Sequence, residues 1–275
     1  MFLKSKRLIE RKEGYDQLHE ILKDKGRSLI IHYSCESFIT SHGRTPRVTS
    51  ISIRSMETGQ VKSFSIHIQA QFDGKDFNNL TTQNYDDLEK KMLDDFYEYE
   101  EDNKNKKWVH WNMRDSNYGF EAIANRYRIL GGTPFYLDDD RKYDFPNILG
   151  KIYTYAYEKN KPDGRFLNLA NRNGISTRDT LTGKEEADAY DNKEYLKLHR
   201  STLRKVDIMN SIIHRTEQNE LKVNVKKKKI YGLSVPGIIE IVKNNWILIA
   251  IWTILFYVLG AATEPVIQRL FGTAE

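Results

Sequence analysis

Three acidic residues in separate parts of the chain could meet in a metal centre. Glu36 ends an apolar segment, Asp115 follows a second one, and Asp207 lies in a long helical pattern. Nucleases that use two metal ions, about 3.5–4 Å apart, need several carboxylates that converge from distant parts of the chain. Because magnesium and manganese prefer hard oxygen ligands, we expect Glu36, Asp115 and Asp207 to hold Mg²⁺ or Mn²⁺.

Each acid also has a structural interpretation that the sequence leaves open. Glu36 would form an ion pair at the end of a strand, and Asp115 would cap a helix that begins near residue 118. Asp207 would pair with Arg204 or Lys205 on the same exposed helix. The spacing of the three acids alone does not decide between one shared site and three separate roles.

Histidines and aromatic residues lie close to these acids in the sequence. His110 or His199 would assist proton transfer at a metal-dependent site, although such histidines are often structural. Trp108, Trp111 and Tyr118 would stack on unpaired bases or line the core. The three aspartates at 138–140 form a rival acidic cluster. Adjacent aspartates point in different directions, which favours a solvated loop there.

The pattern of apolar residues predicts an α/β domain with a mixed sheet flanked by helices. Helical spacing predicts helices over residues 8–22, 84–101, 118–130, 148–157, 166–170 and 194–221. Runs rich in β-branched residues predict strands over 28–35, 47–54, 61–68 and 108–111, with a short fifth strand over 134–137. Because helices and strands alternate after the first three strands, the fold class is α/β.

The order of these elements, together with the three acids, resembles the ribonuclease H-like fold of the DEDD-type 3′–5′ exonucleases. Residues 31–36 (Ile-His-Tyr-Ser-Cys-Glu) are similar to the first motif of that family, and residues 110–115 (His-Trp-Asn-Met-Arg-Asp) resemble its second motif. Segments within 183–207 resemble its third region, where an Asp lies on the last helix. The resemblance covers residues 28–215 and implies a metal-dependent nuclease that acts on nucleic acid.

The chain departs from the family pattern at two places. Ser34 stands where the family has its first Asp, so one metal-bridging carboxylate is missing. Thr202 and Leu203 stand where the family has a Tyr or His before its last Asp, and His199 would substitute from one turn earlier. The resemblance therefore implies a degenerate site that binds metal ions weakly.

An uncharged apolar run covers residues 246–263, near the end of an otherwise polar chain. At about 1.5 Å per helical residue the run is ~27 Å long, close to the ~30 Å hydrocarbon core of a bilayer. We therefore expect a transmembrane helix; the alternative is a fully buried core helix. Four lysines at 226–229 precede the run and only Arg269 is basic after it, so the positive-inside rule predicts a cytoplasmic N-terminal domain.

These features divide the chain into four parts. We expect a domain over 1–222, a basic juxtamembrane linker over 223–245, the span over 246–263 and a short tail over 264–275. Within the linker, residues 235–242 would form a short interfacial helix. A lone cysteine, Cys35, excludes an intramolecular disulfide and a multi-cysteine zinc site.

Two functions fit this layout. The first is a membrane-anchored, metal-dependent nuclease with a divergent exonuclease-like domain. The second is a catalytically inactive module that senses a nucleic acid or nucleotide and uses its transmembrane helix as a membrane effector, for example in microbial defence. Small residues at 260–262 would let the spans of a homo-oligomer approach closely. The missing first Asp disfavours ordinary exonuclease activity.

Overall fold

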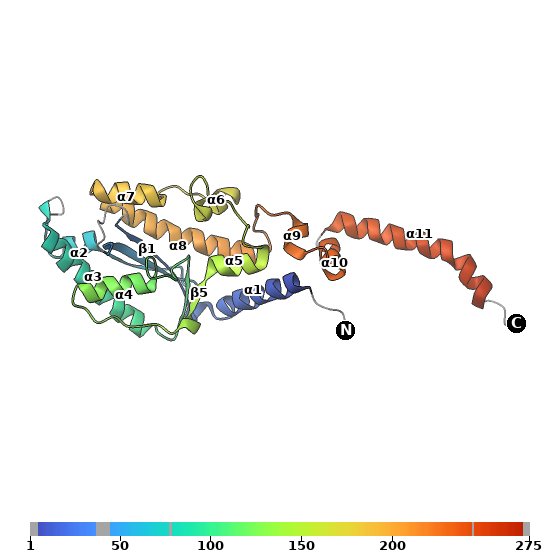
Figure 1. Ribbon diagram of the computed structural model, residues 1–275, viewed down its shortest axis with the longest axis horizontal. Helices are drawn as coiled ribbons and strands as arrows, with labels where there is room; N and C mark the ends of the chain where they lie inside the picture. The colour runs from blue at the N-terminus through green and yellow to red at the C-terminus, as the bar shows by residue number, and fades with distance from the viewer. Residues whose placement is uncertain (1–4, 37–44, 77–78, 244, 272–275) are drawn as a thin grey trace.

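A five-stranded mixed sheet forms the centre of the fold (Figure 1). The structure, a computed structural model, describes residues 5–36, 45–76, 79–243 and 245–271. The strands lie in the order β3-β2-β1-β4-β5. Their bounds are Ser28–Cys35 for β1, Val48–Ser55 for β2, Val61–Ser65 for β3, Lys107–His110 for β4 and Lys142–Asp144 for β5. Helices flank this sheet, so the predicted α/β fold class is confirmed.

The strand directions bring three strand ends to one edge of the sheet. β2 is antiparallel to both of its neighbours, β1 and β3, whereas β1, β4 and β5 run parallel to one another. Along β1, Leu29 and Ile31 pack on one face and Ile30 packs on the other, because side chains alternate along a strand. The carboxyl ends of β1, β4 and β5 therefore meet at the edge where Glu36 and the chain after His110 lie.

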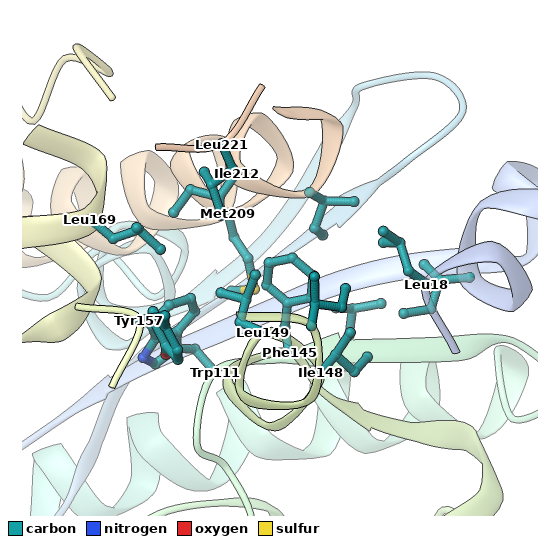
Figure 2. Packing of buried hydrophobic residues seen from close by; sticks show 14 of the residues in the cluster. Leu18, Trp111, Phe145, Ile148, Leu149, Tyr157, Leu169, Met209, Ile212 and Leu221 are labelled. Atoms are coloured by element: carbon teal, nitrogen blue, oxygen red, sulfur yellow. The ribbon is translucent and has the colours of Figure 1, made fainter. Parts of the chain in front are cut away.

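Helices cover both faces of the sheet (Figure 1). The face that carries Ile30 packs against helices α1 (Lys6–Lys23), α5 (Phe145–Tyr153), α6 (Arg165–Arg172) and α8 (Tyr195–Glu217). The opposite face packs against α2 (Ile66–Phe72), α3 (Thr82–Asp102) and α4 (Phe120–Ile129). Helix α7 (Gly183–Asp191) packs on α8 and on β1. Figure 2 shows the first core, in which Phe145 and Leu149 of α5 share one buried cluster with Met209 of α8.

Two predicted strands are wrong in part. The alternating run from residue 61 leaves the sheet at Ser65, and Ile66 and Ile68 belong to α2. Ile66 and Ala70 are both buried, and this four-residue spacing suits one face of a helix. The fifth strand is β5 rather than residues 134–137, because the chain joins the edge of β4 only at residue 142.

The start of α3 also differs from its predicted position. The side chain of Thr81 accepts a hydrogen bond from the backbone N–H of Asn84, and the Asn84 side chain accepts one from the N–H of Thr81. This reciprocal pair is a capping box, which satisfies two free donors at the helix end. Helix α3 therefore begins at Thr82, two residues before the predicted start.

The C-terminal part of the chain contains three more helices. These are α9 (Lys227–Tyr231), α10 (Val235–Lys243) and α11 (Trp246–Phe271). Within the described residues, 246–263 is the one stretch of helix that is long and apolar enough to cross a membrane, and none of it is buried inside the protein. Helix α11 projects away from the sheet (Figure 1). A fully buried core helix is therefore excluded, and the predicted linker contains two ordered helices.

Candidate functional site

Hydroxyl groups occupy the carboxyl end of β1, where the resemblance places a metal-bridging carboxylate. The Ser34 hydroxyl lies 2.8 Å from the hydroxyl of Thr202 on α8, which lies 2.7 Å from the hydroxyl of Ser50 on β2. All three residues are almost completely buried. These three side chains therefore offer neutral hydroxyl oxygens where the family has a carboxylate.

An ion pair completes this cluster. Ser34 and Ser201 both donate a hydrogen bond to Oε1 of Glu186, at 3.1 and 3.0 Å. The ammonium group of Lys205 lies 2.5 Å from the same oxygen, with 8 % of the Lys205 side chain and 13 % of the Glu186 side chain exposed. We call Ser34, Ser50, Glu186, Ser201, Thr202 and Lys205 the lysine–glutamate cluster.

A magnesium ion does not fit the lysine–glutamate cluster. Magnesium needs several oxygen ligands in near-ideal octahedral geometry, usually including carboxylates. The cluster supplies one carboxylate, and the ammonium group of Lys205 already neutralises it. A divalent cation would lie beside a buried positive charge, which is unfavourable in a medium of low dielectric constant.

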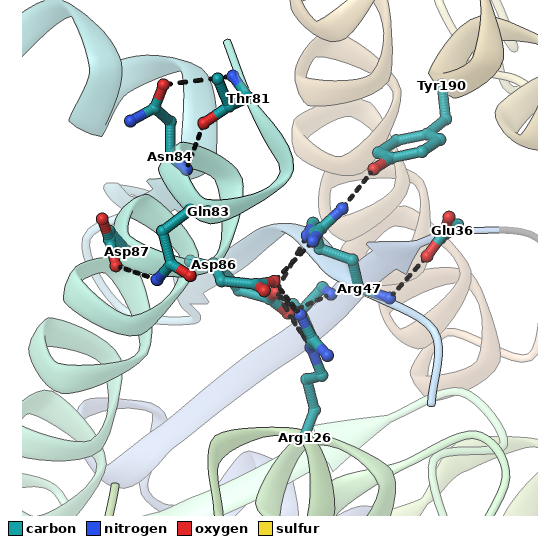
Figure 3. A network of polar contacts seen from close by, with 11 residues as sticks. Glu36, Arg47, Thr81, Gln83, Asn84, Asp86, Asp87, Arg126 and Tyr190 are labelled. Carbon is teal, nitrogen blue, oxygen red and sulfur yellow. Dashed lines mark hydrogen bonds and ion pairs between the residues drawn. The ribbon is translucent and has the colours of Figure 1, made fainter. Parts of the chain in front are cut away.

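Glu36 belongs to a second polar network, shown in Figure 3. Its Oε2 accepts a hydrogen bond from the backbone N–H of Arg47 at 3.3 Å, and its own N–H donates to the Arg47 carbonyl at 2.8 Å. The Arg47 guanidinium contacts Asp86 at 2.5 Å and Glu89 at 3.2 Å, and it donates to the hydroxyl of Tyr190 at 3.0 Å. Glu36 therefore fastens the start of β2 to the end of β1.

The same network joins α3 to α4. Arg126 of α4 contacts Asp86 and Glu89 of α3, both at 2.7 Å, and the Glu89 side chain is fully buried. The backbone N–H of Val48 donates to Glu89 at 2.7 Å. Two arginines thus neutralise two acids, and the buried carboxylate of Glu89 accepts hydrogen bonds from four donor nitrogens, as a buried charge requires.

Asp115 forms a local turn. Its Oδ1 accepts hydrogen bonds from the backbone N–H groups of Asn117 at 2.8 Å and Tyr118 at 2.7 Å. The Tyr118 ring stacks on Tyr33 at a centroid distance of 4.5 Å, and its hydroxyl donates to the Tyr33 carbonyl. Asp115 therefore closes a turn and does not cap the helix as predicted, because α4 begins at Phe120 and its N-cap is Gly119. The ring of Tyr118 is partly buried against the core rather than open for stacking on a base.

Asp207 lies far from Glu36. Its carboxylate contacts Arg54 at 2.7 Å, and Arg54 lies opposite Ile30 in the register of β1 and β2. At about 3.3 Å per residue, Glu36 is ~20 Å further along β1 than Ile30. Among the residues that the structure describes, no three His, Cys, Asp or Glu side chains are grouped to hold a metal ion. The structure therefore does not bring Glu36, Asp115 and Asp207 together.

The two candidate histidines also have separate surroundings. Burial lowers the pKa of His110 to about 3, and its Nδ1 accepts the backbone N–H of Met113 at 3.1 Å. Burial and the neighbouring His67 lower the pKa of His199 to about 4, and the rings of His199 and His67 meet edge to face at 5.1 Å. Both imidazoles are therefore neutral near pH 7.

Sequence reasoning missed Glu186, Lys205 and Arg47 as polar residues of this edge. Glu186 and Lys205 lie in the segments that resemble the third region of the exonuclease family. The sequence predicts no role for Glu186 and predicts Lys205 only as an ion-pair partner of Asp207. Arg47 follows a stretch without a clear pattern. The available signal was the spacing of Thr202 and Lys205, which lie almost one helical turn apart and therefore share a face of α8.

No protein-family model matches the chain. A search of curated proteins gives no match either.

Proposed function

We propose that this protein is a single-pass membrane protein whose cytoplasmic domain has a ribonuclease H-like fold and binds a nucleic acid or nucleotide without cleaving it. The lysine–glutamate cluster carries this proposal. At the position where the exonuclease family needs a metal-bridging carboxylate, the ammonium group of Lys205 is paired with Glu186 and a serine hydroxyl replaces the Asp. A site of this composition can stabilise the packing of α7 and α8 on β1, but it cannot bind two divalent ions.

The ribonuclease H-like part of the proposal rests on the order of the elements. Three antiparallel strands are followed by two helices, a parallel strand, a helix and a second parallel strand, and a long late helix packs on β1. Apart from the short helix α2, this order is the one that resembles the exonuclease family. The cytoplasmic orientation rests on the four lysines before α11 and the positive-inside rule.

A hollow at the start of α8 is our candidate for the ligand site. It has a volume of about 600 Å³, and its lining includes the cationic residues Lys193, Lys197 and Arg200 and the acidic residues Asp179 and Glu194. Lys197 is paired with Glu194 at 3.0 Å, whereas Arg200 is exposed. An exposed arginine of this kind suits the phosphate groups of a nucleotide.

The connection to α11 supports the effector part of the proposal. Helix α9 packs on α1 and α5, and α10 packs on both α9 and α11. A rearrangement in the domain can therefore reach the membrane helix through packed elements. A flexible linker would not transmit it.

The test uses the full chain in detergent micelles with labelled single-stranded DNA and RNA, with and without magnesium or manganese. We expect binding without cleavage, and we expect Arg200→Ala to weaken binding. Arg128→Ala, which removes an exposed arginine from α4, is the matched control and leaves binding unchanged.

Two results would contradict the proposal. Cleavage that requires a divalent ion and disappears in Glu36→Gln and Asp115→Asn would support the nuclease instead. The absence of binding to any nucleic acid or nucleotide tested would remove the sensing module.

A further inference from the structure

Helix α10 and the turn before it expose apolar side chains. Leu233 is 75 % exposed and Val235 is 65 % exposed, and Ile238 and Ile239 are also exposed. A soluble domain rarely leaves such a patch open to water, and a contiguous patch of this kind marks an interaction surface. The patch is continuous with α11, whose apolar residues 246–263 are exposed on all sides.

An apolar groove lies between α10 and the first turns of α11. Its volume is about 630 Å³, and its lining includes Ile238, Ile239, Trp252 and Phe256. Lys243 is the one charged residue in this lining, and it pairs with Glu240 at 3.5 Å at the exposed surface of α10. The groove thus combines an apolar interior with a cation at its edge.

Exposed lysines lie on the adjacent helix. Lys226, Lys228 and Lys229 are exposed, and no ion pair joins any of them to another residue in the described part of the chain. Uncompensated lysines beside an apolar surface suit an anionic bilayer, because each lysine is attracted to acidic headgroups. A protein partner would have to match both the charges and the apolar patch.

Close packing fixes these lysines relative to α10. A Cβ atom on Gly237 of α10 would lie 2.4 Å from the carbonyl oxygen of Tyr231, so the two helices approach as closely as a glycine allows. Tyr231 itself is buried against the domain, with the Arg11 guanidinium 4.7 Å from its ring. Since α9 has only five residues, its lysines lie within roughly one helix length, ~8 Å, of this junction.

We propose that α9 and α10 form a binding surface for anionic phospholipids of the bilayer. The apolar side of α10 lies at the boundary of the acyl region, an acyl chain occupies the groove beside Trp252, and the headgroup phosphates contact the lysines of α9. This inference rests on the proposed membrane span of α11. The inference adds a preference for anionic over neutral phospholipids, which a transmembrane helix alone does not require.

The experiment measures quenching of tryptophan fluorescence by brominated lipids in vesicles that contain the full chain. Trp252 lines the groove, and Trp246→Phe leaves it as the reporter near the lipid. Trp108 and Trp111 are buried in the domain and stay unquenched as an internal reference. Brominated phosphatidylglycerol and brominated phosphatidylcholine are compared at the same mole fraction.

We expect phosphatidylglycerol to quench Trp252 at a lower mole fraction than phosphatidylcholine. Since a lysine near the surface is worth about 1 kcal/mol, removing each of the three lysines should lower this preference by roughly fivefold at most. The variant Lys226→Gln/Lys228→Gln/Lys229→Gln should abolish most of it. The matched control, Lys104→Gln/Lys159→Gln/Lys184→Gln, removes three exposed charges elsewhere and should preserve it.

Three outcomes would overturn the inference. Equal quenching by the two lipids would show that lipid charge is not recognised, while leaving the span intact. An equal loss of preference in the variant and the control would assign the effect to net charge. No quenching by either lipid would place Trp252 outside the bilayer, and it would contradict the proposed membrane span as well.

Discussion

Removing the ammonium group of Lys205 should destabilise the domain unless Glu186 is neutralised at the same time. Lys205→Met leaves the Glu186 carboxylate with only serine donors in a largely buried position. Breaking one partner of a buried pair costs about 3–5 kcal/mol. Because both side chains keep slight exposure to solvent, we expect about 3 kcal/mol for this variant.

A variant that changes both Glu186 and Lys205 measures the interaction between the two charges separately from their other contacts. Glu186→Gln with Lys205→Met replaces both charges by neutral groups of similar size, which is often nearly neutral for stability. We therefore expect the double variant to cost about 1 kcal/mol. Glu186→Gln alone should also cost about 1 kcal/mol, because the Gln amide oxygen still accepts from Lys205, so the coupling energy in the double-mutant cycle should be about 3 kcal/mol. The measurement is guanidinium unfolding of the full chain in micelles, followed by the fluorescence of the buried tryptophans.

The reasoning is refuted if the two single variants are additive, because the charges would then not interact. A Lys205→Met variant as stable as the native protein would also refute it. That result would mean that Glu186 is uncharged or solvated, and the cluster could then accept a cation.

Three further predictions concern other buried groups. Burial raises the pKa of Glu100 to about 8. Between about pH 4.5 and pH 8 the folded state therefore keeps a proton that the unfolded state has released, and the free energy of unfolding falls as pH rises through this range. Glu100→Gln should therefore stabilise the protein by about 3 kcal/mol at pH 7 and by almost nothing below pH 4, as measured by unfolding at both pH values; a difference that does not change with pH would contradict this. Glu89→Gln should cost about 3 kcal/mol in the same unfolding assay, against about 1 kcal/mol for Asp86→Asn, because Glu89 is fully buried and Asp86 is partly exposed. Gly237→Ala should speed hydrogen exchange in α10 by forcing it away from α9, and unchanged exchange would show that the two helices are not in close contact.

The long elements of the fold were predictable because local patterns determine them. Strand β1 contains a β-rich run with the buried apolar residues Leu29, Ile30 and Ile31, and α8 has apolar residues at helical spacing over many turns. The short elements were less predictable. Ile66 and Ile68 continue a strand-like alternation of apolar residues. The chain nevertheless forms helix α2 there, because a helix buries Ile66 and Ala70 on the same face.

The candidate site was harder to predict because its residues depend on long-range packing. The sequence places Glu36 and Asp207 on elements that touch, but it does not say at which point along β1 the helix α8 crosses. The structure places Thr202 beside Ser34, and Asp207 then lies beside Arg54. The position of α8 along β1 therefore decides whether Glu36 and Asp207 share a site. Here Asp207 pairs with Arg54, and Glu36 accepts a hydrogen bond from the backbone of Arg47.

The direction of α8 has a mechanical consequence. The hollow near Arg200 lies at the first turns of this helix, and its last turns lead toward α9 and the membrane segment (Figure 1). At about 1.5 Å per residue, α8 is ~35 Å long and acts as a stiff rod through the core. Packed helices slide past neighbours by only about 1–2 Å without repacking. A ligand that binds at the first turns of α8 would therefore shift this helix slightly along its axis. At the membrane end, the shift would change how α9 packs on α1 and α5.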